Sequence, residues 1–178
     1  MGSLFYLQTI PSSPSAKTYN GSSQASGNTS ATNAGTYTQT CTLSSTTNYK
    51  WSDSTTAAKN ISWTINAKSI SGATVTLGTT SYTYSGSANT PSVTEKDGST
   101  TLTSGTDYTV AYTNNTNAGT ATVTITGKGN YSGTATKTFT ITAKSLTIPS
   151  SPSAKTYNGS SQASGITCPS GSTACVLR

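Results

Sequence analysis

A segment of nineteen residues, TIPSSPSAKTYNGSSQASG, occurs twice without change, at residues 9–27 and again at residues 147–165. The two copies lie 138 residues apart, and a biased composition does not produce nineteen identical positions by chance. Self-similarity at a fixed spacing is typical of arrays in which each repeat is one structural unit. The sequence therefore predicts folded modules in series, an organisation more typical of structural or adhesive proteins than of enzymes.

A weaker repeat lies inside this interval. The motif NAGT begins at Asn33 and again at Asn117, and the pair Asn-Tyr occurs at residues 48–49 and 130–131. The triplet Tyr-Asn-Gly that starts at Tyr19 also resembles the Tyr-Ser-Gly that starts at Tyr84. These matches predict two related modules, module A at residues 8–68 and module B at residues 69–145. A partial repeat of module A follows at residues 146–178. We expect the partial repeat to be a flexible tail, because one or two strands cannot bury a core.

The two modules differ in the length of one interval. From Tyr84 to the NAGT motif module B takes 33 residues, whereas from Tyr19 to the same motif module A takes 14. Module A is thus shorter by a length that can hold a pair of strands. We expect module A to be smaller, less stable and open along one sheet edge, which is a template for pairing with another chain.

The composition and its periodicity predict an all-β fold. About two-fifths of the residues are Ser or Thr, and only 8% are charged. Apolar residues alternate with Thr in residues 119–126 and 134–142, which is the period of a half-buried strand. Glycine-rich turns separate the alternating segments. We expect tandem small β-sandwich modules with an incomplete third module, and the strands expected in module B are 73–77, 81–84, 91–95, 100–103, 107–113, 119–126 and 134–142.

Two segments resemble a known group of modules. GTDYTVAYTNNTNAGTATVTITGKGNYSGTATKTFTI in module B is similar to the immunoglobulin-like repeats of bacterial, mainly Gram-positive, surface proteins. SATNAGTYTQTCTLSSTTNYKWSDSTTAAKNISWTI in module A is similar to companion modules of the MBG and YDG types. Both types also occur in phage structural proteins. The resemblance implies immunoglobulin-like β-sandwiches in a spacer or adhesin stalk on a cell or virion surface, and it carries over no catalytic residue.

Aromatic residues are the candidates for a ligand or partner contact. Trp63 is expected in the core, whereas Trp51, next to Tyr49, is expected as a partly exposed residue at the rim. Tyr131 follows a glycine-rich turn and precedes the last strand, which favours a tyrosine corner that caps the sandwich. An ordinary rim aromatic and a platform for sugar are the alternatives. We therefore select Trp51, Tyr49 and Tyr131 as candidate contact residues.

Three cysteines allow one disulfide. Cys168 and Cys175 can close a small loop in an exported protein, which leaves Cys41 unpaired. Cys41 shares a strand face with Tyr37 and Leu43, so it is interpreted as a small buried hydrophobe. The sequence has no His and no four-cysteine spacing, so it predicts no metal site and no cofactor.

The chain is not expected to be an enzyme, because it lacks His, the usual general base at neutral pH. Its only acids are Asp53, Glu95, Asp97 and Asp107, and no recognisable motif pairs them. The net charge is +6, but the basic residues are spread singly, so nucleic-acid binding is not expected. No apolar run is long enough to insert in a membrane. The start MGSLFYLQ has no basic region, so an export signal is expected outside this chain.

Two classes of function remain. The first is a non-catalytic spacer of a surface-exposed, adhesin-like protein, located extracellularly, on the cell surface or, alternatively, in a virion. The second is a binding module that recognises glycan or a host-surface protein through exposed aromatics. A further hypothesis follows from the exact repeat: residues 147–165 can occupy, on another copy of the chain, the place that residues 9–27 take in module A.

Overall fold

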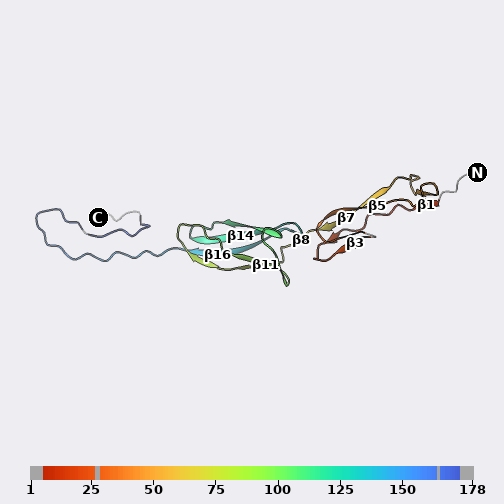
Figure 1. Cartoon of the computed structure of the whole chain (residues 1–178). Helices are drawn as coiled ribbons and strands as arrows, with labels where there is room; N and C mark the ends of the chain where they lie inside the picture. Colours follow the sequence, from red (N-terminus) through yellow and green to blue (C-terminus); the bar gives the residue numbers. More distant parts are fainter. Residues whose placement is uncertain (1–5, 27–28, 164, 173–178) are drawn as a thin grey trace, which may run out of the picture.

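The computed structural model describes residues 6–26, 29–163 and 165–172. In these residues the chain forms strands, turns and extended segments, and none of the described part is helical. The predicted all-β fold class is therefore confirmed, whereas its immunoglobulin-like character stays a prediction. Figure 1 shows an elongated chain, in which the strands of the two modules lie end to end and the C-terminal segment continues beyond them.

Module A is built from short strands around one longer antiparallel pair. Its strands are β1 (Tyr6–Gln8), β2 (Lys17–Thr18), β3 (Gln24–Ser26), β4 (Thr29–Ala31), β5 (Gly35–Cys41), β6 (Tyr49–Trp51) and β7 (Lys59–Asn66). The sheet order is β2-β7-β5, with β2 parallel and β5 antiparallel to β7. Strand β1 pairs in parallel with β6, and β3 pairs antiparallel with β4.

Module B has two larger sheets and one two-stranded sheet. Its strands are β8 (Lys68–Ser69), β9 (Thr74–Leu77), β10 (Ser81–Thr83), β11 (Val93–Asp97), β12 (Thr100–Thr101), β13 (Tyr108–Thr113), β14 (Gly119–Gly127), β15 (Tyr131–Ser132) and β16 (Thr134–Thr142). One sheet has the order β10-β16-β14-β13, the other has the order β12-β11-β9, and β8 pairs with β15. These positions agree with the predicted strands to within about two residues at most ends.

The core of module B lies between its two sheets. Ala121, Val123 and Ile125 of β14 are completely buried, and Phe139 and Ile141 of β16 join them in one cluster. The opposite sheet contributes Leu77, with Val75 and Val93 packed against the cluster. The Thr residues between these apolar positions lie on the other face, since successive side chains of a strand point to opposite faces. This arrangement is that of a small β-sandwich.

Module A keeps part of this plan. Trp63 and Ile65 of β7 are buried, and the ring of Tyr37 on β5 stacks against Trp63 with centroids 5.0 Å apart. Strand β5 has β7 as its neighbour on one side and no second neighbour among the described strands. The expected open edge is therefore present. In module B the corresponding side of β14 is covered by β13, which lies in the interval that module A lacks.

The paired strands of the two modules have the same register. Gly35 of the first NAGT motif lies opposite Ile65, and Gly119 of the second lies opposite Ile141. The residue after β2, Tyr19, donates its backbone N–H to the carbonyl of Asn66 at 2.9 Å. In module B, Tyr84 donates in the same way to Thr142 at 2.8 Å. Tyr19 and Tyr84 therefore occupy equivalent positions, each at the end of a short parallel strand.

The step from one module to the next follows from this register. Residues 65–70 are INAKSI and the equivalent residues 141–146 are ITAKSL, so the chain leaves both modules with nearly the same sequence. Strand β8 pairs with β15 of module B, so the predicted boundary between residues 68 and 69 falls inside a strand. The division of the chain into modules A and B stays a prediction.

Candidate functional site: the contact between the modules

The side chain of Asn130 connects the two modules. Its Oδ1 accepts a hydrogen bond from the backbone N–H of Ala34 at 2.7 Å, and its Nδ2 donates to Oδ1 of Asn33 at 3.0 Å. Asn33 and Ala34 belong to the NAGT turn of module A, whereas Asn130 precedes β15 of module B. A carboxamide offers a donor and an acceptor together, so a single side chain satisfies both groups of the turn. This pair of hydrogen bonds joins the turn of module A directly to the turn of module B.

An aromatic pair lies beside these hydrogen bonds. The ring of Tyr19 in module A meets the ring of Tyr131 in module B edge-on, with the centroids 5.5 Å apart and the planes inclined by 80°. Tyr131 is 8% exposed and belongs to the core cluster of module B, and Tyr19 packs against the same cluster. Burial, with Tyr19 nearby, raises the pKa of the Tyr131 hydroxyl above its usual value. Module A thus extends the apolar interior of module B by one ring.

The polypeptide that joins the modules is held on both sides. Lys68 donates its backbone N–H to the carbonyl of Asn130 at 2.9 Å, and Ile70 donates to the carbonyl of Ser132 at 2.9 Å. The Lys68 ammonium group contacts both carboxylate oxygens of Asp97, at 2.8 and 2.6 Å. This linker is therefore a paired strand and differs from the Gly- and Ser-rich coils that give modules independent motion.

Close backbone packing at this place requires a glycine. A Cβ atom at Gly127, the last residue of β14, would lie 2.6 Å from the backbone nitrogen of Ser132. Atoms of the backbone cannot move away as a flexible side chain can, so any larger residue would displace β15. The turn GKGN, which the sequence identified only as a turn, is thus a closely packed support for Asn130 and Tyr131.

The structure places the three predicted aromatic contact residues differently from one another. Trp51 is 5% exposed, so its expected partial exposure at the rim is wrong. Tyr131 is buried at the contact between the modules, and Tyr49 is half-buried on β6. A ligand contact through any of the three stays a prediction. As expected, Trp63 is a core residue.

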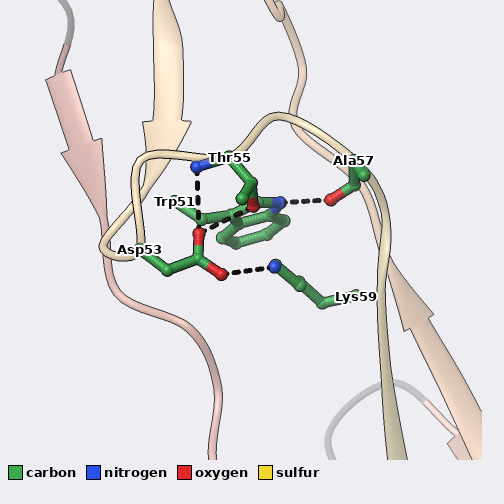
Figure 2. Close-up of polar contacts among 5 residues, drawn as sticks. All are labelled: Trp51, Asp53, Thr55, Ala57 and Lys59. Carbon is green, nitrogen blue, oxygen red and sulfur yellow. Dashed lines mark hydrogen bonds and ion pairs between the residues drawn. The ribbon is translucent and has the colours of Figure 1, made fainter.

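Figure 2 shows why Trp51 is buried. The loop of residues 52–58 folds over the indole ring, and the indole N–H donates to the carbonyl of Ala57 at 2.7 Å. Asp53 holds this loop, because its carboxylate accepts hydrogen bonds from the backbone and the hydroxyl of Thr55 and from the ammonium group of Lys59. The hydrogen bonds from Lys59 and Thr55 lower the pKa of Asp53 from 3.8 to about 2. We interpret this acid as a structural part of the loop.

The remaining acidic groups of the described residues each have a separate place in the fold. The described residues hold no group of three His, Cys, Asp or Glu that could bind a metal ion. Asp97 is the last residue of β11 and pairs with Thr100 across the two-residue turn Gly98-Ser99, and Asp107 accepts the backbone N–H of Thr103 at 2.8 Å. Glu95 lies in the core of module B, with no hydrogen-bond partner for either carboxylate oxygen, and burial raises its pKa. The described part of the chain contains no helix able to cross a membrane.

The cysteines are placed only in part. Cys41 is a free, half-buried thiol at the end of β5. The sulfur of Cys168 is in a disulfide bond. Cys175, its predicted partner, lies outside the described residues, so the predicted pair stays a prediction.

The sequence contains the motifs of the contact but gives no sign that they meet. The pairs Asn48-Tyr49 and Asn130-Tyr131 and the two NAGT motifs indicate only a repeat. Because a turn and a strand end of different modules must meet for the contact to exist, only the three-dimensional arrangement shows it. Comparison of the chain with protein-family models, curated proteins and solved structures gives no match.

Proposed function

We propose that this chain is a structural spacer, a non-catalytic part of a surface-exposed, adhesin-like protein in which tandem modules set the reach of a distal domain. The observation that carries the proposal is the contact between the modules, in which Asn130 and Tyr131 of module B hold Asn33, Ala34 and Tyr19 of module A. A spacer must resist bending. A paired linker strand, two hydrogen bonds and an aromatic contact at one junction restrict the relative motion of the modules.

The surface of the chain is consistent with this role. Threonine and serine side chains cover the outer faces of the strands, and few charged groups interrupt them. An outside location, on a cell or in a virion, is part of the proposal and follows from the resemblance of the modules. The alternative role as a binding module through exposed aromatics loses support at Trp51 and Tyr131, because both rings are buried.

Small-angle X-ray scattering of the full chain tests the spacer. Because the two modules lie end to end and are held at their junction, the scattering curve should fit one elongated arrangement of residues 6–142 with a variable C-terminal segment. The variant Asn130→Ala should need a range of angles between the modules. If the unsubstituted chain also needs such a range, the spacer proposal is wrong.

A second proposal concerns the tail and rests on the exact repeat. Within residues 9–27, Lys17 and Thr18 form β2 on the edge of the sheet of module A. The identical Lys155 and Thr156 lie outside any strand, and Tyr157 is 86% exposed where its counterpart Tyr19 is half-buried. We propose that this segment docks on module A of another copy and replaces its first segment. Deleting residues 146–178 should then lower the mass measured by light scattering at high concentration, and an unchanged mass would exclude the exchange.

A further inference from the structure

Module A contributes Tyr19, Asn33 and Ala34 to the junction with module B. Equivalent residues occur in module B, at the end that faces away from module A. Tyr84 is equivalent to Tyr19, and Asn117 and Ala118 are equivalent to Asn33 and Ala34. The residues that module B contributes to the junction also occur twice. Asn48 and Tyr49 of module A are equivalent to Asn130 and Tyr131 of module B. All five residue types of the contact are thus present again, divided between opposite ends of the chain.

If the repeated residues make no such contact within the chain, they should be more exposed than their equivalents at the junction. Tyr84 is 39% exposed, whereas Tyr19 is half-buried against module B. Ala118 is exposed and Ala34 is half-buried, and Asn48 is exposed and Asn130 is half-buried. Asn33 and Asn117 are both exposed, whereas the other four residues of the junction are each more buried than their equivalents at the two ends.

The strand pairing shows that the supporting backbone is also repeated. Strand β1 runs parallel to β6 with Tyr6 opposite Tyr49, and β8 runs parallel to β15 with Lys68 opposite Tyr131. Each Asn-Tyr pair is thus presented by a short strand that is held by a parallel neighbour. Figure 1 places β1 at the end of module A that is far from module B, so the two repeated halves face outward at opposite ends.

We propose that Tyr84, Asn117 and Ala118 of one copy dock on Asn48 and Tyr49 of a second copy, and that this contact has the geometry of the junction between modules A and B. The Asn48 carboxamide then accepts the Ala118 N–H and donates to Asn117, as Asn130 does with Ala34 and Asn33. A contact between different surfaces on identical chains leaves one surface of each kind free after every addition, so it generates open, head-to-tail chains.

The proposal rests on the spacer function, since it extends the same junction from neighbouring modules to separate molecules. Two local differences will affect its strength. Lys50 and Trp51 follow Tyr49, where Ser132 and Gly133 follow Tyr131. The segment Ser170–Gly171 lies beside Tyr84 and Leu146, around a cavity of about 240 Å³, and docking must displace it.

Complementary variants of the full chain test the proposal. The double variant Tyr84→Ala/Asn117→Ala keeps only the Asn48 end, and the single variant Asn48→Ala keeps only the Tyr84 end. Because these three side chains are exposed, the substitutions leave both cores intact, which circular dichroism can verify. With Tyr157→Ala added to every chain, so that docking of the tail does not contribute, sedimentation velocity from micromolar to millimolar concentration should show a growing mass for the chain with both ends intact. Each of the two end variants alone should then stay monomeric. An equimolar mixture of the two variants should form dimers and nothing larger.

Three outcomes overturn the proposal. The chain with both ends intact stays monomeric to millimolar concentration, or both end variants associate as it does, or the mixed variants grow beyond dimers. The variant Tyr157→Ala separates this contact from docking of the tail, because it alters only the repeated segment and should leave the head-to-tail association unchanged. The spacer function can survive each of these failures, since scattering from the monomer tests the internal junction alone.

Discussion

The backbone N–H of Ala34 donates a hydrogen bond of 2.7 Å to the Oδ1 atom of Asn130, across 96 residues of sequence and from one module to the other. This single bond ties the turn before β5 to the residue before β15. Together with the hydrogen bond to Asn33, it makes Asn130 a direct link between the two modules. The two residues of the Asn-Tyr pair act side by side at the junction. The Asn130 carboxamide bonds to the turn, and the Tyr131 ring packs against Tyr19.

Replacing Asn130 by Ala should open this junction without unfolding either core. The Ala34 N–H then loses its protein acceptor, and its hydrogen exchange measured by NMR should become faster. Asn48→Ala is a matched control, because Asn48 has the same sequence context and lies at the far end of module A. Equal exchange rates of the Ala34 N–H in the unsubstituted chain and in Asn130→Ala would contradict the role assigned to the Asn130 side chain.

Tyr19→Ala should destabilise module B although the substitution lies in module A. The variant loses an edge-on aromatic contact and uncovers part of Tyr131, and such pairs contribute about 0.5–1.5 kcal/mol beyond the area that they bury. We expect a loss of about 1–2 kcal/mol in the unfolding free energy of module B, measured by chemical denaturation. Tyr157→Ala changes the same residue of the identical tail segment, where the ring is 86% exposed. A similar loss in both variants would show that the contact with Tyr131 is not the cause.

Glu95→Leu should stabilise module B at neutral pH. The carboxyl is completely buried without a hydrogen-bond partner, and leaving a buried polar group unsatisfied costs about 1–3 kcal/mol. Since Leu has a similar volume and no polar atoms, most of this cost should disappear. Urea denaturation measures the gain, and a loss of stability in Glu95→Leu would mean that the carboxyl has a favourable partner in solution.

The same residue gives module B a specific pH dependence. Burial raises the pKa of Glu95 above its ordinary value of 4.5, so the folded state holds this proton more tightly than the unfolded state. The tighter binding of this proton contributes fully to the unfolding free energy below the ordinary pKa of Glu95. The contribution is lost as the pH rises through the raised pKa. The variant Glu95→Gln cannot titrate, so the fall in unfolding free energy over this range should be absent from it.

Asp53 should remain ionised in acid far below the usual range of an aspartate. Its pKa is lowered to about 2, first by the hydrogen bond from Lys59 and then by those from Thr55. In Lys59→Ala, the pKa measured from the ¹³C shift of the carboxyl should rise toward 3.8. Lys137→Ala, an exposed substitution on module B, should leave it unchanged. A normal pKa in the unsubstituted chain would show that the loop in Figure 2 is open in solution.

Much of the strand pattern could be predicted because its physical signal is local. Alternation of Thr with Val, Ile or Phe fixes both the strand and its buried face, as Val123 and Ile125 show. The open edge of module A also followed from the sequence, since a missing interval between two shared motifs removes β11, β12 and β13.

The parts that could not be predicted depend on contacts between distant segments. Trp51 is buried because the loop that follows it folds back over the ring, and no periodicity signals this. Glu95 is buried because Val93, Glu95 and Asp97 share one face of β11, and the packing of that face outweighs the preference of a carboxylate for water. The role of Asn130 requires two turns from different modules to meet.

The most direct test of the account is a measurement of whether the modules move as one body. Residual dipolar couplings of backbone amides in β5 and β7 and in β14 and β16 report the alignment of each module separately. We predict that one alignment tensor fits both sets with the arrangement described here. Two tensors of different magnitude or orientation would show independently moving modules and would contradict the fixed junction on which the account depends.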